Sequence, residues 1–250
     1  MKNVLYTLIL GIVFLFASCK KSSETQLPPT TVPVEFTSTV YQFLGSYDSA
    51  GKPNYLISAE QISSSLLAYL NNILVDGKNL RDSHPELLSN PAIADIVITR
   101  TSDVFITFIK QGAAQANALG FYTYRTGQSP ATAKDIKIIT YVFPHVGGGS
   151  PLRAGDKVNI GKFEAGTSIG FVLMRNAWQM KTATLNNNAV HFCSNDALNP
   201  EVDSKLKKHA VLINYPPEDK VLVGFEDSDR TTPGCDNDFN DLEFYCHVVI

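Results

Sequence analysis

The densest set of groups that could do chemistry lies near the end of the chain, in residues 224–241, GFEDSDRTTPGCDNDFND. This segment contains six acidic residues and only one basic residue, Arg230. Carboxylates held within a few ångströms of one another repel strongly, so a folded arrangement needs either a bound cation or side chains that turn outward into water. Asp and Asn are also common in solvated turns, where they bond to their own backbone. A cation site and a solvated acidic turn are therefore both open.

The spacing Asp236-x-Asp238-x-Asn240 favours the cation, because it repeats the first three ligand positions of the calcium-binding EF-hand loop. The rest of that loop is missing, since Asp241 stands in place of the glycine and His247 in place of the last glutamate. Calcium nevertheless accepts six to eight oxygen ligands in flexible geometry. We therefore predict a calcium site that is not an EF-hand. Its predicted ligands are Glu226, Asp227, Asp236, Asp238, Asn240 and Asp241.

The two arms of this loop need anchors. Phe225 and Phe239 are expected to pin the arms to the core, and Pro233-Gly234 is expected to supply the turn between them. Short runs of β-branched and aromatic residues, separated by Gly, Pro, Asn and Asp, predict that the anchoring elements are strands of an antiparallel β-sandwich or jelly roll. The ten predicted strands cover residues 96–99, 104–109, 119–124, 136–143, 157–163, 168–174, 190–193, 210–215, 220–225 and 242–249.

One or two short helices are expected before the strands. Ser58 and Gln61 have the spacing of a capping box, and apolar residues follow at helical intervals. This pattern predicts a helix over residues 59–74, followed by a second short helix over residues 85–88. The apolar stripe consists of Ile62, Leu66, Leu67, Leu70, Ile73 and Leu74.

The chain begins with Lys2, an apolar run over residues 4–16, and Ala17-Ser18-Cys19. The run is too short to span a bilayer but suits a secretion signal, and the small residues before the cysteine resemble the lipobox of bacterial lipoproteins. This resemblance implies that residues 1–18 are removed and that Cys19 carries palmitate-type acyl chains. Residues 19–33 would form the lipidated end and an extended tether. Lys20, where an Asp would retain a lipoprotein in the inner membrane, favours the outer membrane.

Three further cysteines follow, Cys193, Cys235 and Cys246. Export would place them in an oxidising compartment, where one pair can close. Cys246 falls on the predicted core face of the last strand and Cys193 ends an apolar strand, whereas Cys235 lies in the polar loop. We therefore predict a disulfide between Cys193 and Cys246. No C-x-x-C or His/Cys cluster is present, so a zinc site is not expected.

Four ordered segments together resemble the LruC-type domain, which occurs in bacterial secreted and cell-surface proteins and is related to other domains of unknown function. The segments are GFED…DNDFNDLEF at the end of the chain, AGDKVNIGKFEAGTSIGFVL, HPELL and DVFITFIKQGAAQANALGFYTY. The resemblance implies an all-β, calcium-associated module with the six predicted ligands at the family's acidic positions and no known catalytic activity. The expected organisation is an N-terminal helical segment over residues 34–92, packed on a sandwich over residues 93–250.

The leading functional hypothesis is therefore not enzymatic: a lipid-anchored, calcium-binding β-sandwich of the cell envelope with a binding, adhesion or scaffolding role. Its partner would be an envelope protein or a glycan, and the net charge of −3 gives no indication of nucleic-acid binding. One alternative is a carbohydrate-binding module that stacks sugars on Tyr122, Tyr124 and Trp178, although strand aromatics more often lie in the core.

A polysaccharide hydrolase is the other alternative. It would use two carboxyl groups, such as Glu226 with Asp238 or Glu243. Acids clustered beside a cation would have lowered pKa values, which suits a general acid poorly.

Overall fold

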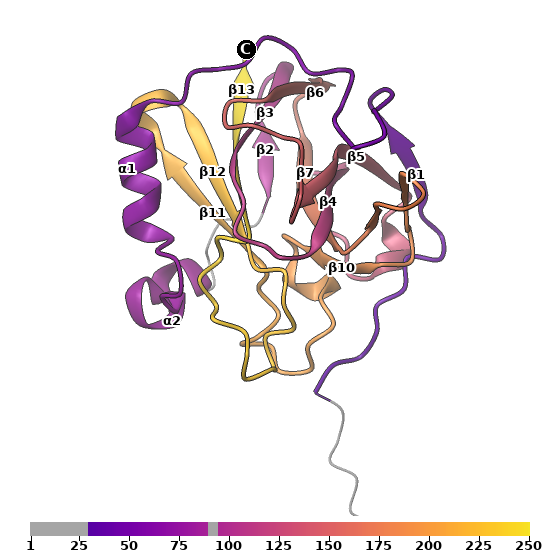
Figure 1. Cartoon of the computed structure of the whole chain (residues 1–250), viewed down its shortest axis with the longest axis vertical. Helices are drawn as coiled ribbons and strands as arrows, with labels where there is room; N and C mark the ends of the chain where they lie inside the picture. The colour runs from indigo at the N-terminus through magenta and orange to yellow at the C-terminus, as the bar shows by residue number, and fades with distance from the viewer. Residues whose placement is uncertain (1–29, 90–94) are drawn as a thin grey trace, which may run out of the picture.

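The computed structural model describes residues 30–89 and 95–250 (Figure 1). The predicted signal peptide, Cys19 and most of the predicted tether lie outside these residues. Within the described part of the chain, no helix is both long enough and apolar enough to cross a membrane.

Two sheets, almost entirely antiparallel, make up most of the fold and confirm the predicted mainly β class. The first sheet has the order β1 (Val40–Phe43), β5 (Ile138–Gly147), β4 (Ala116–Arg125), β7 (Thr167–Arg175) and β10 (Val190–Cys193), with β2 (Ile96–Ile98) also on β7. The second has the order β11 (Ala210–Tyr215), β12 (Lys220–Phe225), β13 (Leu242–Val249), β3 (Ser102–Lys110) and β6 (Lys157–Phe163). A small ribbon pairs β8 (Trp178–Gln179) with β9 (Thr184–Leu185).

The two sheets pack face to face, because buried residues from both form one hydrophobic cluster. Phe171 of β7 meets Phe244 of β13 edge to face, with ring centroids 5.0 Å apart. On β13, Leu242, Phe244 and Cys246 point into this cluster as the alternation of the sequence predicts. Alternate residues of the strands therefore point inward and form the core between the two sheets.

A second cluster covers the outer face of the second sheet. It contains Leu66 and Leu70 of helix α1 (Ser64–Ile73) together with Leu222 and Tyr245 of the sheet. Figure 1 shows α1 lying beside β11 and β12. Because the helix covers this face, Glu243 and Tyr245 are fully buried, although the alternation alone would place them on the opposite side from the core.

Helix α1 begins later than predicted. Its N-cap is Ser63, which accepts a hydrogen bond from the N–H of Leu66 at 3.1 Å, while Ser58 is exposed and lies outside the helix. The intervening segment is held extended by Glu60, whose backbone donates to Gly155 and whose carboxylate accepts from Lys157 at 2.7 Å. These contacts with β6 and with the turn before it outweigh the local capping pattern.

After α1 come α2 (Leu80–Ser83) and a short 3₁₀ helix η1 (Pro85–Leu88), the latter at the predicted position. Residues 34–92 were predicted to form a helical segment, but they also contain a strand. This strand, β1, pairs in parallel with β5 at the edge of the first sheet. The sequence of β1 shows no clear alternation, and most of its residues are exposed.

The predicted disulfide is not formed, and the three described cysteines are free. Cys246 lies in the cluster between the sheets, whereas Cys193 lies in a separate cluster that includes Tyr122 and Met174. The prediction was wrong because both side chains are buried but in different hydrophobic layers. Burial raises the pKa of the Cys246 thiol to about 12, so this group is neutral.

Candidate metal centre

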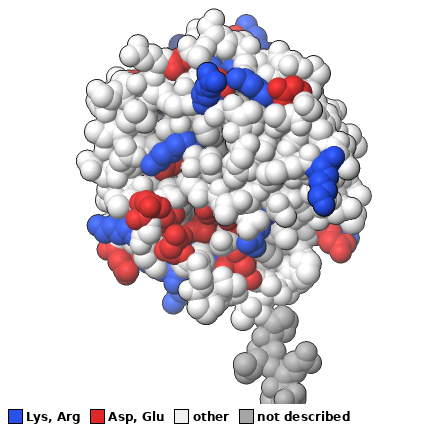
Figure 2. All heavy atoms as spheres, in the orientation of Figure 1, with Lys and Arg blue, Asp and Glu red and all other residues white. Residues whose placement is uncertain are grey.

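The acidic loop connects two neighbouring antiparallel strands, and this connection determines which carboxylates meet. β12 ends at Phe225 and β13 begins at Leu242, and these two residues are register partners. Glu226 and Asp241 therefore leave the sheet side by side. The N–H of Asp227 donates to Asp241 Oδ2 at 2.7 Å, which closes the base of the loop. In Figure 2, acidic side chains gather at the part of the surface where Figure 1 shows this loop.

Both predicted anchors of the loop are confirmed. Phe225 is fully buried in the cluster between the sheets, and Phe239 is fully buried in the cluster beneath α1. Gly224 allows this packing, since a Cβ there would lie 2.5 Å from the carbonyl oxygen of Phe239. At the far end of the loop, Pro233-Gly234 forms the predicted turn, with the N–H of Cys235 donating to the carbonyl of Thr232 at 3.2 Å.

The only arginine in the loop does not neutralise its acids. The Arg230 Nε donates to Asn237 Oδ1 at 2.8 Å, and its Nη1 donates to the carbonyl of Lys208 at 2.6 Å. Asn237 adopts a left-handed backbone conformation with φ 58°, which asparagine tolerates better than most residues. Arg230 therefore supports the shape of the loop between the two aspartates on either side of Asn237, Asp236 and Asp238.

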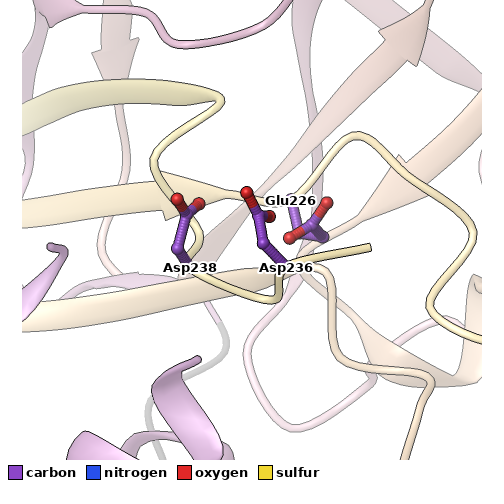
Figure 3. A group of neighbouring side chains, drawn as sticks. All are labelled: Glu226, Asp236 and Asp238. Atoms are coloured by element: carbon purple, nitrogen blue, oxygen red, sulfur yellow. The ribbon is translucent and has the colours of Figure 1, made fainter. Parts of the chain in front are cut away.

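Five of the six predicted ligands are carboxylates, and the structure divides them into two groups that share Glu226. In the first group, Glu226, Asp236 and Asp238 each offer one oxygen, and these oxygens all lie within 4.8 Å of one another (Figure 3). In the second group, the same holds for Glu226, Asp227 and Asp241. The sequence prediction that these residues converge is thus supported by their geometry.

Glu226 occupies the centre of this arrangement and lacks a partner for one oxygen. Its side chain is only 1% exposed. Its Oε1 accepts from the N–H of Ser228 at 3.2 Å, but its Oε2 is buried with no hydrogen-bond partner. An unsatisfied buried carboxylate oxygen costs considerable free energy unless something binds it.

Asp238 and Asn240 play different parts. The Asp238 carboxylate accepts from the N–H of Gly77 at 2.7 Å and from the side-chain amide of Asn240 at 2.8 Å. Asn240 therefore orients Asp238. The sequence predicted that Asn240 and Asp238 bind the same ion, but Asn240 directs its amide nitrogen, a donor, toward the Asp238 carboxylate. The Gly77 contact also ties the loop to the turn after α1.

That turn supplies an acid that the sequence analysis missed. Asp76 Oδ1 lies 3.5 Å from the side-chain amide of Asn240. The pKa of Asp238 is raised first by burial, then by the charge of Asp236, and to a smaller extent by the charge of Asp76. The pair Asp76-Gly77 reads in sequence only as the end of a helix. Asn240 lies 164 residues after Asp76 in the chain, and no local pattern indicates that the two segments meet.

The electrostatics of the cluster are those of uncompensated negative charge. Among the described residues, no Lys, Arg or His forms an ion pair with any of the five carboxylates. Burial raises the pKa of Glu226, and the charges of Asp236 and Asp238 raise it further. Burial, followed by the charges of Asp227 and Glu226, raises the pKa of Asp241 to about 9.

These shifts predict how the calcium-free protein responds to pH. A raised carboxyl pKa means that the folded state holds the proton more tightly than the unfolded chain does, so the resulting stabilisation is full below the ordinary pKa of 3.8 and is lost as pH rises through about 9. In chelator, the melting temperature should therefore fall between about pH 5 and pH 9 through the titration of Asp241. If the predicted calcium site forms here, calcium replaces the proton, and saturating calcium should remove most of this fall.

The comparison of the two melting profiles isolates the loop, because ionisable groups elsewhere titrate alike with and without calcium. The stabilisation by calcium should grow steadily with pH. A calcium effect that is the same at pH 5 and at pH 9 would contradict the assignment of the shifted groups to the metal centre.

The hydrolase alternative finds little support in the position of its carboxyl groups. Glu243 is fully buried beneath α1, where its Oε1 lies 3.2 Å from Lys110 Nζ. Burial raises its pKa to about 7. Glu226 and Asp238 are each only 1% exposed, so neither is placed to act on a polymer.

The proposed sugar-stacking platform is wrong for two of its three rings. Tyr122 and Trp178 are 1% and 2% exposed. Trp178 stacks on His145 with centroids 5.5 Å apart, and Tyr122 packs in the cluster that also holds Cys193. These aromatics belong to the core, as strand aromatics usually do.

Comparison with known proteins gives one partial match. A family described as Domain of unknown function (DUF4114) matches residues 163–248, a span that includes β7, β12, the whole acidic loop and all of β13 except its last residue. No curated protein and no solved structure matches the chain.

Proposed function

We propose that the loop over residues 226–241 binds calcium and that the protein is a calcium-stabilised β-sandwich module with a binding, adhesion or scaffolding role. The observation that carries this proposal is the gathering of five carboxylates in two groups that share Glu226, whose buried Oε2 has no hydrogen-bond partner. None of the described Lys, Arg or His residues forms an ion pair with these five carboxylates. Oxygen ligands of this type and number suit calcium, whose site tolerates irregular geometry. The resemblance of the chain to the LruC-type domain supports the same reading.

The first carboxylate group favours a site that is open on one side. Glu226 and Asp238 are buried, whereas Asp236 is exposed. An ion held by these three would therefore keep coordination positions directed toward water. An oxygen of a partner, either an envelope protein or a glycan, could replace that water.

The proposed location is the cell envelope, with the chain anchored through acyl groups on Cys19 in the outer membrane. The short apolar run before Ala17-Ser18-Cys19 supports this part of the proposal. The first described residues lie close to the acidic loop, since the hydroxyl of Thr231 donates to that of Thr30 at 3.2 Å. The tether would thus leave the domain at the end that carries the loop.

The anchor is tested by expressing the full chain and its Cys19→Ala variant in a bacterial host. The native chain should enter the detergent phase on phase partitioning, because several acyl chains on one residue give stable membrane attachment. The variant should remain in the aqueous phase. A variant that still enters the detergent phase would show that the acyl anchor is not at Cys19.

The calcium proposal is tested by thermal melting of the purified protein in chelator, in calcium and in magnesium. A cation that binds only the folded state stabilises it by about 2.7 kcal/mol at a hundredfold excess over Kd. Calcium should therefore raise the melting temperature clearly, and magnesium should raise it less because it demands a tighter octahedron and loses its water reluctantly.

The opposing outcome is equally clear. Equal melting temperatures in chelator and in millimolar calcium, together with no bound metal by elemental analysis, would return the loop to a solvated acidic turn.

A further inference from the structure

The two carboxylate groups of the acidic loop are distinct, and their geometry bears on the number of ions. Calcium lies about 2.3–2.6 Å from its oxygen ligands, so two oxygens on one ion are at most about 5 Å apart. The oxygens of Glu226, Asp236 and Asp238 meet this limit, and so do those of Glu226, Asp227 and Asp241. The five carboxylates fall into two such groups and not into one.

Glu226 is built as a bridge between the groups. It is the one member that both share, its side chain is 1% exposed, and its Oε2 has no hydrogen-bond partner. A carboxylate can bind one ion through each oxygen, and paired metal ions in proteins are typically about 3.5–4 Å apart. The buried oxygen without a hydrogen-bond partner is a second indication of a bound ligand, in addition to the clustering of the carboxylates.

Each group is also bonded to another part of the fold. The first group is bonded to the turn after α1 through Asp238 and Gly77, and the second group is bonded to the sandwich through Asp227. Asn117 of β4 is fully buried and donates through Nδ2 to Asp227 Oδ2 at 2.6 Å. The other side of the same amide accepts from the N–H of Asn176 at 2.8 Å, which fixes its orientation. Asp227 in turn donates its N–H to Asp241. This group is therefore a positioned pair of carboxylates beside Glu226, and not a loose turn.

The charge of the five carboxylates also favours two calcium ions. When all five carboxylates are ionised, one divalent ion would leave three negative charges uncompensated in a region where Glu226, Asp227 and Asp238 are buried, while two ions would leave one. Among the described residues, no cationic side chain pairs with any of these carboxylates. Uncompensated buried charge is costly, so the second ion removes a large penalty.

We propose that the loop is a two-ion calcium site in which Glu226 bridges an outer ion, held with Asp236 and Asp238, and an inner ion, held with Asp227 and Asp241. This inference rests on the proposed calcium function and deepens it. The outer ion borders the exposed Asp236 and is the one that faces solvent. The inner ion joins the base of the loop to β4 through Asn117 and is structural.

The test is the number of calcium ions bound by the purified protein, measured by equilibrium dialysis with elemental analysis and by calorimetric titration. The expected result is two ions per chain. One ion per chain would overturn this inference and leave the proposed calcium function standing, whereas no bound calcium would overturn both. Because this measurement uses the native protein, it does not depend on the folding of any variant.

Two variants then assign the ions. Asp236→Asn should remove the outer ion and Asp241→Asn the inner ion, so each should bind one calcium per chain. Both substitutions keep the size and an acceptor oxygen of the side chain while removing its charge. Either variant binding two ions would show that its group is not a calcium site.

Discussion

Replacing Glu226 with glutamine should abolish the response of the protein to calcium. Glu226 is the only carboxylate shared by both groups, and glutamine keeps its shape but offers one neutral oxygen and a donor in place of a charged bridge. Loss of an outer-shell partner alone costs about 10–100-fold in metal affinity, so removal of the proposed direct ligand should cost about 100-fold or more. The measurement is calcium titration monitored by calorimetry and melting temperature.

In chelator, this variant should melt no lower than the native protein, because it also removes a buried charge from a repelling cluster. The matched control is Asp229→Asn in the same loop. Asp229 lies outside both carboxylate groups and accepts from the N–H of Thr231 at 2.8 Å, a contact that asparagine can retain. The control should respond to calcium as the native protein does. Native calcium affinity in the Glu226→Gln variant would contradict the proposal that Glu226 is the ligand shared by both groups.

Phe239→Ala should destabilise the protein by about 3–5 kcal/mol, the usual cost of deleting a fully buried phenylalanine. Phe239 is fully buried in the cluster with Leu70 and Tyr245, and Arg230 lies over its ring at 5.1 Å. The same side chain holds the arm that carries Asp238, so calcium affinity should fall as well. Denaturant unfolding with and without calcium measures both effects.

Phe43→Ala is the control for this substitution. Phe43 lies on the edge strand β1 and is 44% exposed, so its removal should cost much less and leave calcium binding unchanged. Native stability in the Phe239→Ala variant would mean that the arm of the loop is not anchored by this ring. Native calcium affinity combined with a large loss of stability would mean that the metal centre forms independently of the anchor.

Most of the strands could be predicted from the sequence because their signal is local. The strands over residues 157–163, 190–193, 210–215, 220–225 and 242–249 have the predicted bounds. Alternation and turn residues are sufficient for them. The strand β1 was missed since it has no such pattern and depends on pairing with β5, about 100 residues further along the chain.

The start of α1 shows where local patterns fail. The spacing of Ser58 and Gln61 fits a capping box, but Glu60 between them is drawn to lysines of the second sheet, Lys157 and Lys220. The N–H of Glu60 is also bonded to the carbonyl of Gly155, in the turn before β6, and these contacts hold the segment outside the helix. The sequence holds no sign of those two lysines being near.

The candidate site was predictable for the residues that the loop itself contains. The types and spacing of Asp236 and Asp238 indicate a cation, and the pairing of Phe225 with Leu242 explains why Glu226 joins them. The contributions of Asp76 and Asn117 come from a helical turn and from β4, and only the fold brings them to the loop. The division of the carboxylates into two groups likewise depends on three-dimensional distances that sequence spacing does not give.

The most direct measurement is a crystal structure of the protein grown in calcium, with an anomalous difference map calculated at a wavelength where calcium scatters anomalously. We expect a peak about 2.3–2.6 Å from oxygens of Glu226, Asp236 and Asp238, the usual distance from calcium to its oxygen ligands. A map without any anomalous peak in the loop at millimolar calcium, with these carboxylates turned toward water, would contradict the central claim that the loop folds around calcium.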